Sequence, residues 1–367
     1  MTFEEARAQF PVLERFAYLN AGTNGPLARA TVVAMEEWNR RDLEQGRGDN
    51  EYYETTIALR REVRSALAAV LEVARENVAI VSSTTNACNV VLAGLGLGTG
   101  DEIVTTDVEH FGLIGPLLAS PARVRVARLR DARAADAPRL VLEQVTDRTR
   151  LIAISHVSWM TGNSLGPEEL RRETDLPILV DGAQSVGAIP VAAERYDFYT
   201  VSAQKWLGGP DSTGALYLRD PERLRIALPT YMSQTAYDVE DTFTPPPGAP
   251  RFDSVWLAPG TLAGLLAALA AAPEWRYERV RGTAALCRSR LAAAGCDLVT
   301  APGQAGLVSF VSPADAAETA ARLYEAGVVV RDVPGTGWIR ASCGWWTSDE
   351  DVERLVAALA SQTPRQE

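Results

Sequence analysis

Short apolar runs recur between residues 78 and 218, and each gives way to small or polar residues. The runs at 78–81, 102–106, 151–154 and 178–180 contain few charges, which is typical of strands buried on both faces of a sheet. Segments with helical spacing lie between these runs. We therefore predict an α/β fold with a mostly parallel sheet and right-handed crossovers.

Two helical patterns precede the first of these strands. One is expected to begin near Pro26, because proline suits the first turn of a helix, and to run toward Gln45. The second pattern covers 51–71, with apolar residues on one face.

The last third of the chain predicts a small α+β region after a mainly helical stretch at 258–294. Its predicted strands cover 306–311, 328–331 and 337–341, and its predicted helices cover 313–326 and 348–360. Thr347 and Glu350 have the spacing of a capping box at the start of the last helix.

A proline-rich stretch at 245–250 lies near the change from sheet to helical pattern, and such a stretch is typical of a linker. We therefore predict three parts. An N-terminal arm at 1–17 packs on the small domain, a large cofactor-binding domain covers 18–255, and the small C-terminal domain covers 256–367.

The bulk composition excludes several classes of function. A net charge of −11 and a pI near 4.9 argue against a nucleic-acid partner, which needs a basic face. The four cysteines have no framework spacing, so a reduced, cytoplasmic protein is expected. No apolar run reaches the length of a membrane span, and the two distant histidines do not predict a metal site.

Two reactive residues follow neighbouring predicted strands. Asp181 ends the apolar run that begins at residue 178, and Lys205 follows a short strand pattern at 197–201. Because the carboxyl ends of parallel strands meet at one edge of a sheet, both residues are expected at one crevice. A lysine amine can form a Schiff base with pyridoxal phosphate, and a carboxylate keeps the cofactor's ring nitrogen protonated. The pair therefore predicts a pyridoxal 5'-phosphate site.

The sequence Val-Asp-Gly-Ala-Gln-Ser-Val-Gly at 180–187 and the Ser-x-x-Lys at 202–205 resemble the class V branch of fold-type I pyridoxal-phosphate enzymes. This branch includes cysteine desulfurases, selenocysteine lyase, isopenicillin-N-epimerase-like proteins and cysteine/cystine C–S lyases. The resemblance extends over nearly the whole chain. It implies a mostly parallel, mixed seven-stranded sheet, a small α+β C-terminal domain and a homodimer.

The resemblance also implies which residues hold the cofactor. Lys205 would carry it, Asp181 would pair with the ring nitrogen, and His110 would stack on the ring. Further cofactor contacts would come from Thr84, Thr85, Trp159, Gln184, Ser202 and Gln204. Simple helix capping is the alternative for the two threonines. Trp159 and Gln204 replace the Asn and His that many relatives have, and Trp256 replaces a Thr that reaches the partner's phosphate.

Two arginines flank a predicted turn at 334–337. A hairpin centred on this turn places Arg331 opposite Arg340, with both side chains on one face. By resemblance, Arg340 binds the substrate's α-carboxylate, a bidentate task that suits arginine. Arg331 would meet the second carboxylate of a cystine-like substrate or, alternatively, form a surface salt bridge. Ala21 and Gly22 would pass close to the substrate.

The resemblance favours a C–S lyase that acts on the small-molecule amino acids cysteine, cystine or a cysteine S-conjugate. Lys205 would remove the Cα proton, and a thiol or persulfide, pyruvate and ammonia would result. A cysteine desulfurase is the alternative, but the turn at 332–339 lacks the nucleophilic cysteine that desulfurases carry. Cys343 is expected to be packed, and Cys88 is expected to lie within a helix. Epimerisation, decarboxylating deamination, transamination and cofactor binding without turnover also remain open.

Overall fold

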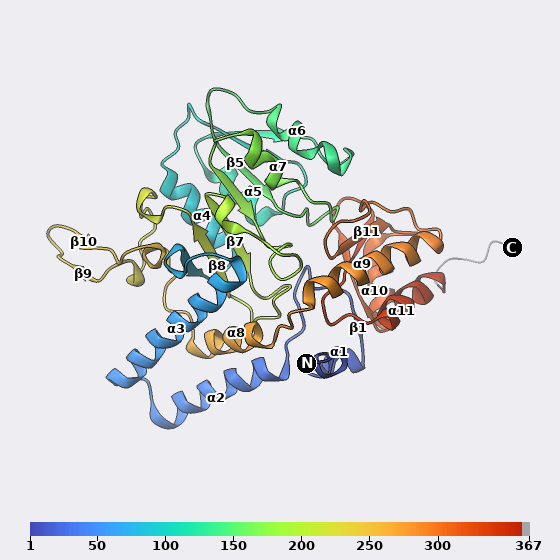
Figure 1. Ribbon diagram of the computed structural model, residues 1–367, viewed down its shortest axis with the longest axis horizontal. Helices are drawn as coiled ribbons and strands as arrows, with labels where there is room; N and C mark the ends of the chain where they lie inside the picture. The colour runs from blue at the N-terminus through green and yellow to red at the C-terminus, as the bar shows by residue number, and fades with distance from the viewer. Residues whose placement is uncertain (362–367) are drawn as a thin grey trace.

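The computed structural model describes residues 1–361, and a seven-stranded sheet forms its centre (Figure 1). The strands lie in the order β2-β8-β7-β6-β5-β3-β4, and within this sheet only β8 runs antiparallel to its neighbours. They are β2 Val78–Val81, β3 Glu102–Thr106, β4 Arg123–Ala127, β5 Thr149–Ser155, β6 Ile178–Asp181, β7 Phe198–Ser202 and β8 Gly214–Leu218. This confirms the predicted mostly parallel α/β sheet.

Successive residues of the central strands enter two different hydrophobic clusters, because side chains alternate across a sheet. Ile80 and Val180 belong to one cluster, whereas Ala79 and Leu179 belong to the other. Both faces are therefore covered by helices, as parallel sheets require. The helices of this part are α2 Arg29–Gln45, α3 Asn50–Leu71, α4 Thr84–Leu95, α5 Phe111–Ala119, α6 Ala137–Leu142, α7 Pro167–Glu173 and α8 Pro259–Ala271.

The C-terminal part, orange to red in Figure 1, contains a three-stranded antiparallel sheet in the order β11-β14-β13. Its strands are β11 Leu307–Val311, β13 Arg331–Val333 and β14 Trp338–Ser342, and its helices are α9 Arg276–Ala293, α10 Ala316–Glu325 and α11 Asp349–Ala360. A short hairpin of β9 (Ala236–Tyr237) and β10 (Phe243–Thr244) projects from the opposite side of the molecule.

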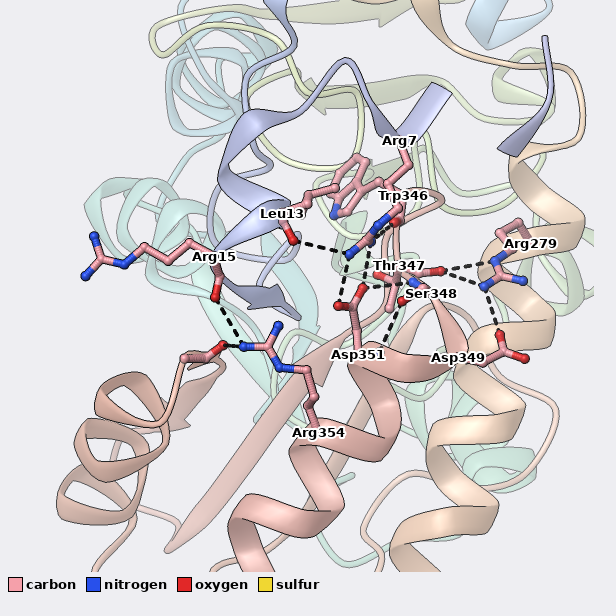
Figure 2. Close-up of polar contacts among 11 residues, drawn as sticks. Arg7, Leu13, Arg15, Arg279, Trp346, Thr347, Ser348, Asp349, Asp351 and Arg354 are labelled. Atoms are coloured by element: carbon pink, nitrogen blue, oxygen red, sulfur yellow. Dashed lines mark hydrogen bonds and ion pairs between the residues drawn. The ribbon is translucent and has the colours of Figure 1, made fainter. Parts of the chain in front are cut away.

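The first residues of the chain are bound to its C-terminal part (Figure 2). Arg7, at the end of α1 (Phe3–Arg7), forms an ion pair of 2.7 Å with the buried carboxylate of Asp351 and donates to the Trp346 carbonyl. Strand β1 (Ala17–Tyr18) pairs in parallel with β12 (Val328–Val329). Residues 1–18 therefore contact the C-terminal part through α11, the loop before it and β12, while the exact domain boundaries stay a prediction.

The structure corrects three expected element boundaries. Helix α2 begins at Arg29, so Pro26 lies in the preceding loop; the Arg29 N–H instead donates to the Gln9 carbonyl. The capping box of α11 uses Ser348 and Asp351, one residue later than expected. The expected strand at 328–331 is split between β12 and β13.

The proline-rich stretch at 245–250 is not a free linker. Ala249 is fully buried, and the Gly248 N–H donates to the Glu222 carboxylate. Within residues 1–361, no helix is both long and apolar enough to cross a membrane.

Candidate active site

Four side chains with hydroxyl or carboxyl groups meet at the carboxyl ends of β6 and β7. Thr84 Oγ1, at the start of α4, lies 3.0 Å from Ser202 Oγ and accepts a 3.2 Å hydrogen bond from Thr200 Oγ1. Thr200 Oγ1 also lies 3.4 Å from Asp181 Oδ1. The sheet therefore places the last residues of two neighbouring strands and the first residue of a helix at one point, as the sequence predicted.

Asp181 ends β6 and is only 3 % exposed. Its Oδ1 accepts a 2.8 Å hydrogen bond from the Ala183 N–H in addition to the contact with Thr200. Among the described residues, these hydrogen bonds use Oδ1 alone. A buried carboxylate with one free oxygen can bind a protonated ring nitrogen.

Lys205 lies in the tight turn that follows β7, and its side chain is half-buried. Desolvation lowers the pKa of the Lys205 amine to about 8, the charge of Arg340 also lowers it, and the carboxylate of Asp181 acts in the opposite direction. The turn is packed against the N-terminal loop, because a Cβ on Gly25 would lie 2.2 Å from the Lys205 carbonyl. The backbone of Lys205 is therefore held against the N-terminal loop, and its amine loses a proton more readily than an ordinary lysine amine.

The N-terminus of α4 lies beside these groups. Ser83 caps the helix by accepting from the Asn86 N–H, which leaves the hydroxyls of Thr84 and Thr85 outside the cap. Gln204 precedes the lysine, and its side-chain Oε1 is buried without a partner among the described residues. Free N–H groups at a helix start, surrounded by hydroxyls, favour a bound phosphate.

His110 is the N-cap of α5, and its ring lies in a T-shaped arrangement with Trp159 at a centroid distance of 5.2 Å. Because Nδ1 accepts from the Gly112 N–H, a neutral imidazole carries its proton on Nε2. Desolvation, followed by the charge of Lys205, lowers the pKa of His110 below its usual value. The Trp159 Nε1 atom is buried without a partner among the described residues.

Arg340 is 2 % exposed and forms no ion pair with an acid among the described residues. Its guanidinium donates to two neutral oxygens, the Trp159 carbonyl at 2.9 Å and Thr23 Oγ1 at 3.0 Å, while Nε has no partner. Desolvation and the charge of Arg331 lower its pKa to about 10. A buried cation without a carboxylate is costly, so the site favours an anionic ligand.

The predicted hairpin register is confirmed, because Arg331 on β13 pairs directly with Arg340 on β14. The Arg331 side chain is 46 % exposed, and its nearest acid is Asp332, with an Nε to Oδ1 distance of 3.7 Å. Side chains directly opposite each other share one face of the sheet. The two cations therefore form one basic site, in which Arg340 is the buried member and Arg331 the exposed member.

Gln184 connects the loop after β6 to the N-terminal loop. Its Nε2 donates to the Gly22 carbonyl at 2.8 Å, and its Oε1 accepts from the Trp206 indole at 3.0 Å. A Cβ on Gly22 would lie 2.9 Å from that Oε1, so only glycine fits there. Ala21 is fully buried next to it. One N–H of the Gln184 amide remains for a ligand, and its role in cofactor binding stays a prediction.

Sequence reasoning missed Thr23, Thr200 and Trp206, which hold Arg340, Asp181 and Gln184 through long-range hydrogen bonds. Thr200 alternates with Ser202 along β7, and this spacing could have indicated that both face one site. The other two contacts join distant segments, so no local pattern indicates them. Trp256 stacks on Tyr53, with ring centroids 5.6 Å apart.

The sequence model of the aminotransferase class-V family matches residues 17–355, which includes every residue of this site. The chain belongs to the class V aminotransferase family. A cysteine desulfurase of Klebsiella pneumoniae is 31 % identical over 98 % of both chains. The isopenicillin N epimerase of Streptomyces clavuligerus is 29 % identical, also over 98 % of both chains.

The chain is also similar to a solved structure, that of the cystine C–S lyase C-DES in complex with its reaction product cysteine persulfide. The TM-score is 0.89 at 28 % identity, and the match covers 97 % of this chain and 100 % of C-DES. A C-DES mutant with glycine covalently linked to its PLP cofactor also has a TM-score of 0.89. The chain therefore has the fold of the fold-type I pyridoxal-phosphate enzymes.

Members of this family use pyridoxal phosphate, and the donors of this chain fit that group. Lys205 supplies an amine, Asp181 has a free carboxylate oxygen, and the start of α4 supplies N–H groups and hydroxyls. The unpartnered Oε1 of Gln204 does not fit a phosphate, because it is an acceptor. The side-chain amide nitrogen is the only side-chain donor that Gln204 has for a phosphate.

Proposed function

We propose that this protein is a pyridoxal-phosphate-dependent C–S lyase, which cleaves cysteine, cystine or a cysteine S-conjugate by β-elimination. The products are a thiol or persulfide, pyruvate and ammonia. The single observation that carries the proposal is the pairing of buried Arg340 with exposed Arg331 on one sheet face. Two similar proteins, a cysteine desulfurase and a cystine C–S lyase, support a reaction at a C–S bond.

Arg340 orients the substrate by binding its α-carboxylate. Two of its nitrogens are already held by Trp159 and Thr23, so the guanidinium cannot rotate freely. An anion bound to this fixed group places the substrate's Cα in one position.

Lys205 acts as the general base that removes the Cα proton. A pKa of about 8 leaves a useful fraction of the amine neutral near pH 7. When bound, pyridoxal phosphate supplies the electron sink for the pair released at Cα. With the cofactor bound, Asp181 would hold a proton on the ring nitrogen with its free carboxylate oxygen, and His110 would lie against the ring and supply a proton to the leaving sulfur.

Cysteine desulfurase is the second candidate, because relatives of similar identity carry that name. A desulfurase needs an accessible thiolate as its nucleophile. Cys88, Cys287 and Cys343 are fully buried, and burial raises the pKa of the Cys88 thiol. Cys296 is half-buried and follows α9, outside the turn between Arg331 and Arg340. These positions support elimination without a protein persulfide.

The test is a product assay of purified holoenzyme with cystine, cysteine and S-methylcysteine. We expect pyruvate and ammonia in equal amounts, together with a thiol or persulfide. Recovery of alanine with no pyruvate would support a desulfurase instead. A D-amino acid, an amine or a keto acid that retains sulfur would identify epimerisation, decarboxylation or transamination.

We also propose that the protein is a homodimer. The supporting observation is a set of exposed apolar side chains near the N-terminal part of α2, including Leu27 at 41 % and Val33 at 48 % exposure. Exposed apolar patches on a soluble chain mark contact surfaces. Light scattering after size-exclusion chromatography should give twice the mass of one chain, and a mass of one chain would refute this proposal.

A further inference from the structure

A line of hydrogen bonds lies behind Asp181 and uses none of the groups assigned above. Glu168 Oε1 lies 3.1 Å from His156 Nε2, and His156 Nδ1 lies 2.6 Å from the Tyr199 hydroxyl. The Tyr199 hydroxyl lies 2.7 Å from Ser185 Oγ, which lies 3.1 Å from the Gly182 carbonyl. We call these five residues the His156 chain.

The His156 chain runs from the surface to the centre of the molecule. The Glu168 side chain, on α7, is 36 % exposed. His156 is 4 % exposed, and Tyr199 and Ser185 are fully buried. Burial acts to raise the pKa of the Glu168 carboxyl, but the hydrogen bond and charge of His156 outweigh it and lower this pKa to about 2. The outer end is therefore a carboxylate.

The inner end of the His156 chain is the turn that follows Asp181 and carries Gln184, two residues expected to contact the cofactor. The Gly182 carbonyl accepts from the N–H groups of Ser185 and Val186, which closes the turn. The same turn presents the Ala183 N–H to Asp181 Oδ1 and the Gln184 amide to the Gly22 carbonyl. Any shift of this turn therefore reorients the Asp181 carboxylate.

Tyr199 also supports this turn through its ring. A Cβ on Gly182 would lie 2.2 Å from Tyr199 Cε1, so the ring touches the Gly182 backbone directly. The position of the ring is fixed by its hydroxyl, which lies between His156 and Ser185. The position of the Tyr199 hydroxyl therefore affects two contacts with Gly182. One is the contact of the Tyr199 ring with the Gly182 backbone, and the other is the contact of Ser185 Oγ with the Gly182 carbonyl.

The number of protons available in the His156 chain determines which protonation form of His156 gives every contact a hydrogen bond. Four contacts join the five residues, and each needs one proton. Neutral His156, Tyr199 and Ser185 together supply three protons, whereas an imidazolium supplies the fourth. With charged His156, Nδ1–H donates to Tyr199, Tyr199 donates to Ser185, and Ser185 donates to Gly182. With neutral His156, one of the four contacts has no hydrogen.

We propose that His156 is a positioning residue, which acts through Tyr199 and Ser185 to fix the turn at 182–185 and thereby the orientation of Asp181. The proposal rests on the cofactor site of the proposed function, but not on the reaction at the C–S bond. Besides Glu168 and Tyr199, the ionisable groups that face the His156 chain are Tyr196, whose ring is tilted against that of Tyr199, and Asp181. The Asp181 carbonyl accepts from the His156 N–H at 3.0 Å.

The experiment compares holoenzymes of Ser185→Ala, Tyr199→Phe and the double variant. Each single variant removes one hydroxyl and no ionisable group that touches the cofactor. Tyr217→Phe is the matched control, because Tyr217 pairs with Tyr199 in the sheet but lies outside the His156 chain. Thermal unfolding of every variant is measured first, and Ser185→Ala, the smallest change, remains informative where Tyr199→Phe is poorly folded.

The first readout is the rate of cofactor release during dialysis, which is monitored through the loss of visible absorbance. We expect each single variant to release cofactor about tenfold faster than wild type, as for one lost hydrogen bond. The double variant should release it no faster than either single variant, because the residues act as one chain. Additive effects, or release rates equal to those of Tyr217→Phe, would overturn the proposal.

The second readout is the NMR titration of His156 in the holoenzyme. The chain has two histidines, so His156→Gln identifies the signals. Ser185→Ala should move the His156 titration to lower pH, because the imidazolium loses the acceptor chain that stabilises it. An unmoved titration would overturn the proposal. Neither readout uses a substrate, so a failed lyase assay would reject the proposed function and leave this inference standing.

Discussion

Arg331 and Arg340 face each other across β13 and β14, although like charges in direct register destabilise a sheet pair. The buried member, Arg340, has only neutral oxygens as partners among the described residues. The charge of Arg331 contributes to the lowered pKa of Arg340. A bound dicarboxylate would neutralise both cations. In the proposed function, this pair is therefore the feature that selects the substrate.

We expect Arg340→Ala to impair every amino-acid substrate, because each has an α-carboxylate. Loss of such a charged contact costs about 2–5 kcal/mol, so kcat/KM should fall at least roughly 30-fold. Arg340→Lys is the control that retains the charge but cannot bind a carboxylate through two parallel N–H groups. Steady-state kinetics with S-methylcysteine measures both. Activity within a factor of two of wild type would remove Arg340 from the site.

Arg331→Ala should discriminate between substrates. We expect a loss of roughly tenfold or more in kcat/KM for cystine, whose second carboxylate would meet Arg331, and little change for S-methylcysteine. Asp332→Ala serves as a control, because Asp332 is the only acid near Arg331 among the described residues. Equal losses for both substrates would mean that Arg331 binds the α-carboxylate or supports the fold.

Lys205 gives a prediction that depends on pH. With a pKa of about 8, the amine is mainly charged below pH 8 and mainly neutral above it. Because only the neutral amine attacks an aldehyde, apoenzyme should bind pyridoxal phosphate covalently about five times faster at pH 8 than at pH 7. Stopped-flow absorbance measures this rate. Lys205→Ala should form no borohydride-fixed adduct, and an adduct on another lysine would contradict the assignment.

The cysteines should be dispensable for C–S cleavage. Cys343 is fully buried, and its pKa is raised by the hydrogen bond to Cys287 and by burial. Neither Cys88→Ser nor Cys343→Ser should lower kcat by more than about threefold, a loss that mild repacking explains. Mass spectrometry of the intact holoenzyme after turnover provides the decisive measurement. A protein persulfide that disappears in one variant would establish desulfurase chemistry.

The parts of the site that the sequence predicted follow from local patterns. Asp181 and Ser202 end strands, and parallel strands must bring such residues together. The register of Arg331 and Arg340 followed from the turn between them, since side-chain direction alternates along each strand. In each case the controlling interaction lies within one element or one hairpin.

The missed contacts join segments that only the complete fold brings together. Thr23 and Arg340 are hydrogen-bonded although 317 residues separate them in the sequence. Trp206 donates to Gln184, and strand β7 lies between these two residues in the sequence. Pro26 was misplaced for a similar reason, because the partner of the Arg29 N–H is the distant carbonyl of Gln9. Tertiary hydrogen bonds therefore determine both where α2 begins and how the Arg340 guanidinium is oriented.

Asp181→Asn should separate cofactor binding from catalysis. An amide keeps the shape of the side chain and the hydrogen bond from the Ala183 N–H, but it cannot hold a positive charge on a ring nitrogen. We therefore expect the variant to retain cofactor while kcat falls by about 100-fold or more, as for lost electrostatic stabilisation of a transition state. Thr200→Val is the matched control, because it removes the 3.4 Å contact to Oδ1 and leaves the carboxylate charge. Its kcat should fall much less. Equal losses in the two variants would show that orientation of the carboxylate, rather than its charge, is what the reaction needs.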